Sequence, residues 1–201
     1  MNQSVELKFW KYQDEKQLLK EIEELGRNAY QSFEKTSEDS CFRFIDMIIK
    51  KGHLGLLEHH YITFKIITNR AIANELVRHR IAAYVQESTR YVNYGKETTP
   101  QPIFISQTPW DEESYKTMVA SFETYDRLVK SGVAPQHARD FLPLGLKTCI
   151  YATMNIRSWF HFYELRSAPN AHPLMRDLAE MIMNEIGTIM PTIHNKMIGN
   201  P

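Results

Sequence analysis

The segment from Tyr61 to Arg80 constrains the fold most, because it joins the clearest strand signal in the chain to a cluster of positive charge. Residues 61–68 are rich in β-branched and aromatic side chains, which predicts a strand. Residues 69–82 carry apolar side chains at helical spacing and predict a helix. Arg78-His79-Arg80 lies within that helix, so we expect partly buried cations that require anionic partners. On a helix the two arginines lie about 200° apart, which suits two separate anionic ligands.

A polar stretch follows this cluster. If residues 86–90 are extended, Gln86, Ser88 and Arg90 share one face of the strand. An amide, a hydroxyl and a guanidinium in a row would form a polar wall for a small hydrogen-bonding ligand. The alternative is a surface helix whose basic residues are merely solvated, as charge runs usually are.

Strands and helices mix irregularly along the chain, which predicts an α+β fold rather than a doubly wound sheet. No linker or repeat divides the sequence, so we expect a single domain over residues 1–201. We expect strands at 5–12, 61–68, 103–105 and 148–153, and helices at 15–25, from the polar residues 37–40 to about 51, and at 69–82, 112–130, 135–140, 156–165 and 173–189.

The composition excludes several classes of protein. The formal net charge is zero, which gives no global attraction to nucleic acid or to a membrane surface. Cys41 and Cys149 cannot form a disulfide framework and suit a reducing compartment. No signal-peptide pattern and no apolar run of about 18 residues is present, so we expect a soluble cytoplasmic protein without membrane or nucleic-acid partners.

A group of histidines around Glu58 raises the question of a metal site. The spacing of His53, Glu58, His59 and His60 does not match His-Glu-x-x-His, so we expect no metal. A hydrogen-bonded loop that leads into the next strand accounts for His59 and His60. The chain also lacks a Gly-x-Gly-x-x-Gly fingerprint and a phosphate-binding Walker loop.

Four blocks, which occur in the same order as in the family, together resemble the flavin-dependent thymidylate synthases. The most specific block is Arg78-His79-Arg80, followed after seven residues by Ser88 and then by Arg90-Tyr91. The others are Gly52-His53 with Leu57-Glu58-His59; Ala138-Arg139 before Leu142-Pro143-Leu144; and Asn155-Ile156-Arg157-Ser158 with His161 and Glu164-Leu165-Arg166. The resemblance extends from about Leu25 to about Glu185.

The resemblance implies an enzyme that converts dUMP to dTMP by reductive methylation. Its cofactor would be FAD, reduced by NADPH, and its one-carbon donor would be methylenetetrahydrofolate. It also implies helices packed around a central, mostly antiparallel sheet, and a homotetramer whose active sites are shared between subunits. Neither cysteine has the setting of an activated nucleophile, which agrees with a cofactor that carries the difficult chemistry.

The resemblance also implies roles for individual residues. Arg166 would be catalytic, meeting the pyrimidine and favouring its ionisation, and His53 would lie on the folate side. The residues implied for dUMP are Glu75, Arg78, Gln86, Ser88, Thr89, Arg90, Arg139 and Arg166. The residues implied for FAD are Gly55, Glu58, Arg78, His79, Arg80, Gln86, Asn155, Arg157 and His161.

For some of these residues, a purely structural role explains the residue type as well as a role in ligand binding does. Asn155 stands where a helix N-cap would stand, and Arg166 could form an ion pair with Glu164 or Asp177. The family pattern is broken at Glu75, at Gly55, and at Ala83, Val85 and Gln86. A nucleotide- or nucleic-acid-binding module without catalysis, and a family member that has lost activity, therefore stay open as alternatives.

Overall fold

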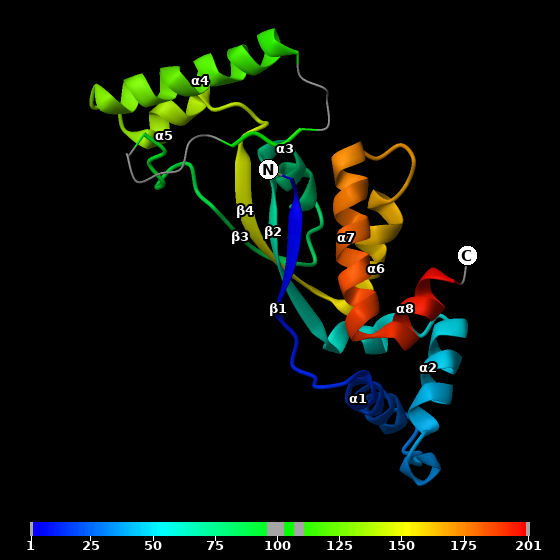
Figure 1. Ribbon diagram of the computed structural model, residues 1–201. Coiled ribbons are helices and arrows are strands. Elements are labelled where there is room, and N and C mark those ends of the chain that lie inside the picture. The colour runs from blue at the N-terminus through cyan, green and yellow to red at the C-terminus, as the bar shows by residue number, and fades with distance from the viewer. Residues whose placement is uncertain (1, 96–102, 107–110, 200–201) are drawn as a thin grey trace. The chain divides into compact units, whose positions relative to one another are not determined.

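The fold is α+β and is built on one four-stranded antiparallel sheet with the strand order β1-β2-β4-β3 (Figure 1). The computed structural model describes residues 2–95, 103–106 and 111–199. The strands are β1 (Ser4–Phe9), β2 (Tyr61–Asn69), β3 (Ala83–Gln86) and β4 (Lys147–Asn155). The predicted fold class and the predominantly antiparallel sheet are therefore confirmed.

The helices follow the apolar periodicity of the sequence in most places. They are α1 (Glu15–Asn28), α2 (Ser40–Lys50), α3 (Arg70–Leu76), α4 (Glu112–Lys130), α5 (Pro135–Ala138), α6 (Ile156–Arg166), α7 (Pro173–Ile189) and α8 (Pro191–Ile198), with short 3-10 helices η1 (Phe33–Lys35), η2 (Leu54–His59) and η3 (Arg139–Phe141). Within the described residues, no helix is long and apolar enough to cross a membrane.

The chain groups into two compact units. The first unit comprises residues 1–6, 65–80 and 84–152, and the second comprises residues 7–64, 81–83 and 153–201. Strands β1, β2 and β4 each contribute residues to both units. The expectation of one domain over the whole chain stays a prediction.

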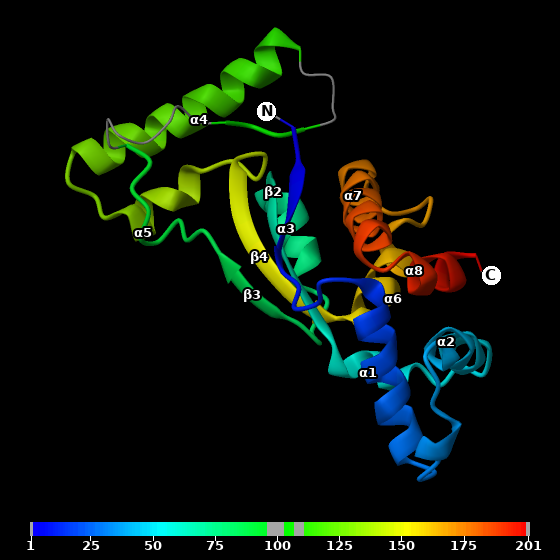
Figure 2. The same ribbon diagram turned by 60° about the horizontal axis from the view of Figure 1, so that its bottom comes forward.

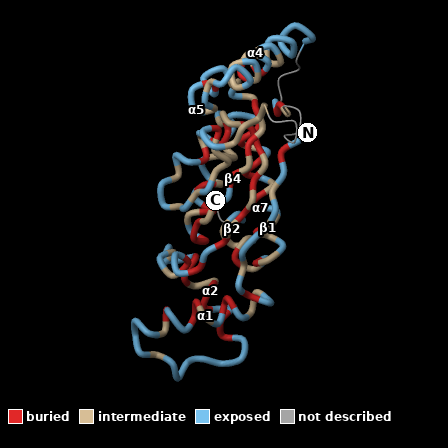
Figure 3. The backbone as a smooth tube through the Cα atoms, turned by 90° about the vertical axis from the view of Figure 1, so that its left-hand side faces the viewer, coloured by how far each residue is buried: buried red, intermediate tan, exposed pale blue. Residues whose placement is uncertain are grey.

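The first unit has a small core under the long helix α4. Phe122 and Tyr125 of α4 pack with Phe104, Ala138 and Leu146, and all five are buried. Most of the remaining α4 surface is exposed (Figure 3). This helix therefore contributes one narrow apolar stripe, which binds α5 and η3 to it.

The second unit has a larger helical core, and Trp159 lies at its centre. Its fully buried indole packs edge-on against Phe64 of β2 and Phe162 of α6, with ring centroids 5.2 and 5.7 Å apart. The indole N–H donates to the backbone oxygen of Ile62 at 3.2 Å, so burial leaves no unpaired donor. Helix α6 also packs along α7, and the two lie side by side in Figures 1 and 2.

Two strands end in an asparagine that caps the next helix. Asn69, the last residue of β2, accepts a hydrogen bond from the backbone N–H of Ile72 at 2.8 Å. Asn155, the last residue of β4, accepts one from Ser158 at 2.8 Å. Each cap satisfies a helix N–H that has no partner within the helix, and so lets a strand pass directly into a helix.

The predicted helix over residues 69–82 is too long. Helix α3 ends at Leu76, and the Arg-His-Arg motif lies in the turn that follows it. The Tyr84 hydroxyl lies within hydrogen-bonding distance of the carbonyl oxygens of Leu76 and His79, at 2.9 and 2.8 Å, and stabilises this turn. The helical spacing of Arg78 and Arg80, and the two opposed directions deduced from it, are therefore wrong.

Three other predicted boundaries differ. β1 ends at Phe9 rather than at residue 12, because the Tyr12 side chain turns inward and is buried. Around residues 103–105 only Phe104 pairs, in an isolated bridge to Leu146. Helix α8 was not expected, and Pro191 stands at its first position, which proline tolerates well.

Tyr12 links α1 to the start of β2 through a buried relay. Its hydroxyl donates to Glu21 at 2.7 Å and lies 2.5 Å from Nδ1 of His60. Because the Tyr12 hydroxyl donates its proton to Glu21, it can only accept from His60, so the Nδ1 of His60 is the donor. The buried Nε2 of His60 has no partner among the described residues. Burial lowers the pKa of His60 from its usual 6.5, and burial with the Glu21 hydrogen bond raises the pKa of Tyr12 to about 12.

This relay predicts a loss of stability in acid. Unfolded His60 takes up a proton near pH 6.5, whereas folded His60 resists it, so the free energy of unfolding should fall as the pH drops below 6.5. We expect His60→Gln to lose less stability than wild type between about pH 7.5 and about pH 5.5 in urea unfolding. His137→Gln, at an exposed position, is the control. An unchanged pH dependence in His60→Gln would contradict this account.

Candidate functional site

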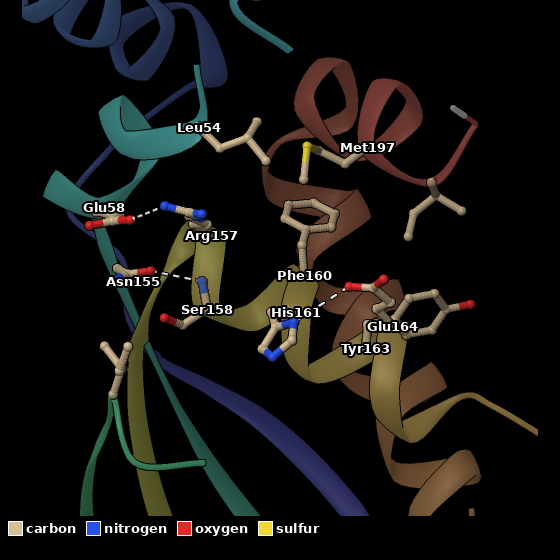
Figure 4. Close-up of a pocket in the computed structure, with 12 residues that line it drawn as sticks. Leu54, Glu58, Asn155, Arg157, Ser158, Phe160, His161, Tyr163, Glu164 and Met197 are labelled. Carbon is tan, nitrogen blue, oxygen red and sulfur yellow. Dashed lines mark hydrogen bonds and ion pairs between the residues drawn. The ribbon is translucent and has the colours of Figure 1, made fainter. Parts of the chain in front are cut away.

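A pocket of about 770 Å³ lies in the second unit at the N-terminal end of α6 (Figure 4). Its residues come from η2, from the segment after the Arg-His-Arg motif, from α6 and from α8. They are Leu54, Glu58, Ile81, Asn155, Arg157, Ser158, Phe160, His161, Tyr163, Glu164, Met197 and Ile198. The volume is within the range usual for small-molecule sites.

The junction between β4 and α6 positions the polar side of this pocket. Asn155 is almost fully buried and caps α6, and the next residue, Ile156, donates its N–H to the backbone oxygen of His60 at 2.9 Å. Both ends of the junction are thus held by hydrogen bonds. The N-terminus of α6, where the helix dipole is positive, faces the pocket and favours an anionic group.

Arg157 and His161 share one face of α6, as their spacing predicts, and both line the pocket. Arg157 donates to Glu58 at 2.5 Å, and about half of each side chain is exposed. No other hydrogen bond of the Arg157 side chain is found among the described residues, so further guanidinium N–H groups can bind a ligand. Nδ1 of His161 lies 3.4 Å from Glu164.

Apart from the hydroxyl groups of Ser158 and Tyr163, the rest of the lining is apolar. Leu54 comes from η2, Phe160 from α6, and Met197 and Ile198 from α8, while Ile81 directly follows the Arg-His-Arg motif in the sequence. An arginine, a helix N-terminus and apolar walls in one pocket suit a ligand that combines a flat ring with an anionic group.

Other predicted residues of the second unit lie elsewhere. His53 and Gly55 line a separate cavity of about 850 Å³, although Leu54 between them lines the first pocket. Arg166 is half-buried at the last position of α6 and does not line either cavity.

In the first unit, the Arg-His-Arg motif offers exposed charge. The side chains of Arg78 and Arg80 are exposed, and neither has an ion pair within the part of the chain that the structure describes. The expectation of partly buried arginines is therefore wrong for the single chain, and the need for anionic partners that was deduced from burial stays a prediction.

The predicted extended face over residues 86–90 is also wrong. Gln86 ends β3 and donates to Thr148 at 3.2 Å, but Ser88 begins a turn in which the backbone N–H groups of Tyr91 and Val92 donate to its carbonyl oxygen. Thr89 is buried within this turn. Backbone pairing with β4 ends at Glu87, whose N–H donates to the Cys149 carbonyl oxygen at 2.9 Å, and from Ser88 on the chain satisfies its backbone locally.

This turn places Arg90, a predicted nucleotide-binding residue, against α5, the helix that leads into Arg139. Arg90 donates through Nε to Gln136 of α5 at 3.2 Å, and Arg139 lies three residues further along the same helical segment. Residues three apart share a helix face, so Gln136, which holds Arg90, and Arg139 lie on the same side of this segment, and both arginines are exposed. Glu75 of α3 is half-buried in the same unit.

Sequence reasoning missed Glu87, which anchors this region to β4. Its carboxylate accepts from the Tyr94 hydroxyl at 2.5 Å and from the Cys149 N–H at 3.1 Å, and lies 3.5 Å from Lys147. Burial, with the Glu87 contact, raises the pKa of Tyr94, which therefore stays a neutral donor. Glu87 lies between Gln86 and Ser88, which are both candidate ligand residues, and this position was the feature of the sequence that could have identified it.

Metal and thiol chemistry find no support in the geometry. Within residues 2–95, 103–106 and 111–199, no three His, Cys, Asp or Glu side chains are grouped as they would be to hold a metal ion. Burial raises the pKa of both Cys41 and Cys149, so neither thiol is activated as a thiolate.

The structure thus defines an α+β protein with a pocket that joins an arginine to a helix N-terminus, and comparisons with known proteins identify its family. Residues 11–192 match the family described as thymidylate synthase complementing protein. A flavin-dependent thymidylate synthase of Geobacter sulfurreducens is 37% identical over 164 residues, covering 80% of this chain and 71% of the relative. That of Pyrococcus furiosus is 34% identical over 167 residues, covering 80% and 68%.

A solved structure shares the fold. The UMP/dUMP methylase of Streptomyces cacaoi, bound with 5-Br dUMP, superposes with a TM-score of 0.79 over 98% of this chain and 95% of that chain, at 22% identity. The chain belongs to the flavin-dependent thymidylate synthase family, a family of methyltransferases.

Asn155 offers a test of how the pocket is held. Asn155→Ala removes the cap of α6 and should lower the free energy of unfolding by about 1 kcal/mol, whereas Asn155→Asp keeps an accepting oxygen and should cost less. Urea unfolding at neutral pH measures both. Equal stability of the Ala and Asp variants would show that the cap does not hold this junction.

Proposed function

We propose that this chain methylates dUMP to dTMP, with FAD as cofactor, NADPH as reductant and methylenetetrahydrofolate as one-carbon donor. One observation carries the proposal. Glu58 of η2 and three residues of the β4–α6 junction, Asn155, Arg157 and His161, are all implied for the flavin by sequence resemblance, and they line one pocket. Membership of the family and the nucleotide analogue bound to the structural neighbour support the same reaction.

The pocket fits part of a flavin dinucleotide. Arg157 and the N-terminus of α6 would bind phosphate oxygens, while Leu54 and Phe160 would contact a flat ring. His161 would add a hydrogen bond, and Glu58 would hold Arg157 in place. When bound, the flavin supplies the hydride that no protein side chain can provide. Gly55, Arg78, His79, Arg80 and Gln86 complete the proposed flavin set.

Exposed arginines of the first unit would bind the substrate. Arg78, Arg90 and Arg139 offer charge-assisted hydrogen bonds to a phosphate and to a pyrimidine edge. Ser88 would position the nucleotide rather than attack it. Glu75, Gln86 and Thr89 belong to the same proposed set, with Thr89 acting through the turn that it stabilises.

Arg166 would stabilise negative charge that develops on the pyrimidine. A guanidinium aimed at such charge contributes several kcal/mol to many reactions. We further propose a homotetramer in the cytoplasm with active sites shared between subunits and with His53 toward the folate. Since Arg78 and Arg80 are exposed in the single chain, a ligand or a second subunit would supply their anionic partners.

Flavin binding tests the pocket. Titration of the purified protein with FAD should produce flavin absorbance and saturable binding, and Arg157→Ala should raise the Kd at least about tenfold because a charge-assisted hydrogen bond is lost. Arg43→Ala, at an exposed position outside both cavities, should bind FAD like wild type. A preparation that retains no flavin absorbance after FAD is added and unbound FAD is removed would refute the assignment as a flavin enzyme.

Arg166→Ala tests the chemical step. We expect dTMP formation to fall at least about a hundredfold while FAD stays bound, because the lost interaction acts on the developing charge. Arg176→Ala, also on a half-buried arginine of the second unit, is the control. Unchanged turnover in Arg166→Ala would remove the catalytic assignment and favour a structural ion pair.

A further inference from the structure

Helix α8 forms one wall of the first pocket. Met197 and Ile198, the α8 wall, come from the last turn of this helix and both line the pocket. In Figure 4 the Met197 side chain points from α8 toward Leu54 of η2 and Phe160 of α6. The family match covers residues 11–192, so both wall residues lie beyond the matched part of the chain. Neither belongs to the flavin set proposed above, and their role is therefore open.

Helix α8 has little stability of its own. It contains eight residues, and an isolated helix of that length is marginal in water. Its N-cap residue is Met190, whose side chain carries no oxygen and makes no capping hydrogen bond. The position of the α8 wall is therefore set by contacts between α8 and other segments.

Glu15, the first residue of α1, caps α8 from a distant part of the chain. Its Oε1 accepts from the backbone N–H groups of Thr192 and Ile193 at 2.7 and 3.2 Å. Its Oε2 accepts from the Thr192 hydroxyl at 2.8 Å. One half-buried carboxylate thus satisfies two N–H groups that have no partner within the helix, and it places negative charge at the positive end of the helix dipole.

Packing and an ion pair hold the rest of α8. Ile193 is fully buried, and a Cβ added at Gly187 of α7 would come within 3.4 Å of the His194 ring. Nζ of Lys196 donates to Asp46 of α2 at 2.6 Å. Both side chains of this pair are about one-third exposed, so the pair contributes little stability by itself. The buried cap at Glu15 is therefore the polar contact that fixes where α8 begins.

We propose that Glu15 is a positioning residue for the flavin and acts through α8. Glu15 does not line the pocket, whereas Met197 lies five residues after Thr192, about 7.5 Å further along the helix axis. By fixing the first turn, Glu15 holds the α8 wall against the pocket. The polarizable thioether of Met197 would then contact the flat ring of the flavin. The inference rests on the proposed function, because it takes this pocket to hold the flavin.

The test compares the affinity for FAD among matched variants that remain folded. Glu15→Ala removes the cap and should raise the Kd at least about fivefold, whereas Glu15→Gln keeps an accepting oxygen and should largely retain the wild-type Kd. Asp111→Ala is the control, because Asp111 caps α4 by accepting from the Ser114 N–H at 2.7 Å. This control should lose stability in urea as Glu15→Ala does, but it should bind FAD like wild type.

A double-mutant cycle tests the route through the α8 wall. Met197→Ala/Ile198→Ala should weaken FAD binding, and adding Glu15→Ala in that background should have little further effect, because the two changes act on one contact. The Kd for dUMP should stay at its wild-type value in all these variants, whereas a general loss of structure would weaken both ligands. If Glu15→Ala weakens FAD binding by the same factor in both backgrounds, the route through α8 is overturned.

The outcomes separate this inference from the proposed function. If wild type and Glu15→Ala bind FAD equally well, Glu15 does not position the flavin, and the proposed enzyme stands. If Glu15→Ala does not fold, Met197→Ala/Ile198→Ala still decides, because it leaves the cap in place; unchanged FAD affinity in that variant overturns the role of the wall. A wild-type protein that binds no FAD overturns the flavin function and this inference together.

Discussion

The direct passage of β4 into α6 is the constraint on which the candidate site depends. Asn155 satisfies the Ser158 N–H, and the carbonyl oxygen of His60 accepts from Ile156, so the helix begins without a connecting loop. Trp159, one turn into α6, is buried against Phe64 and holds the helix on β2. With the start and the inner face of α6 both held, Arg157 and His161 can only point toward the pocket.

The two cavities of the second unit differ in the chemistry of their walls. The first combines a helix N-terminus with Arg157 and apolar walls, which suits phosphate and a flat ring. The second combines the buried Phe44 ring with Lys35 and Lys51, which form no ion pair with any residue that the structure describes. In both, an arginine is oriented by a glutamate, Glu58 for Arg157 and Glu23 for Arg27, so each retains donors for a ligand. Orienting such a group in advance lowers the entropy cost of binding.

Local pattern predicted the regular elements well where one face is buried. Strand β2 alternates buried and less buried residues as its sequence suggests, and α7 has the predicted bounds because its apolar stripe faces a core. The same reasoning failed after Leu76, where Val77 and Ile81 continue the apolar spacing but are exposed. A hydroxyl from Tyr84, eight residues beyond the last helical residue, competes for the backbone there. Periodicity cannot reveal such a partner, because it records spacing and not what lies opposite.

The sequence by itself determined the family, the α+β class, the capping role open to Asn155 and the chemical types available for the site, because these depend on residue identity and spacing. Only the tertiary structure decided which of those residues meet. It placed Glu58 against Arg157, ninety-nine residues away, and separated His53 and Gly55 from Leu54 into different cavities. It also put the Arg-His-Arg motif in an exposed turn. Contacts between distant segments depend on how helices and strands pack, and local sequence carries no record of that packing.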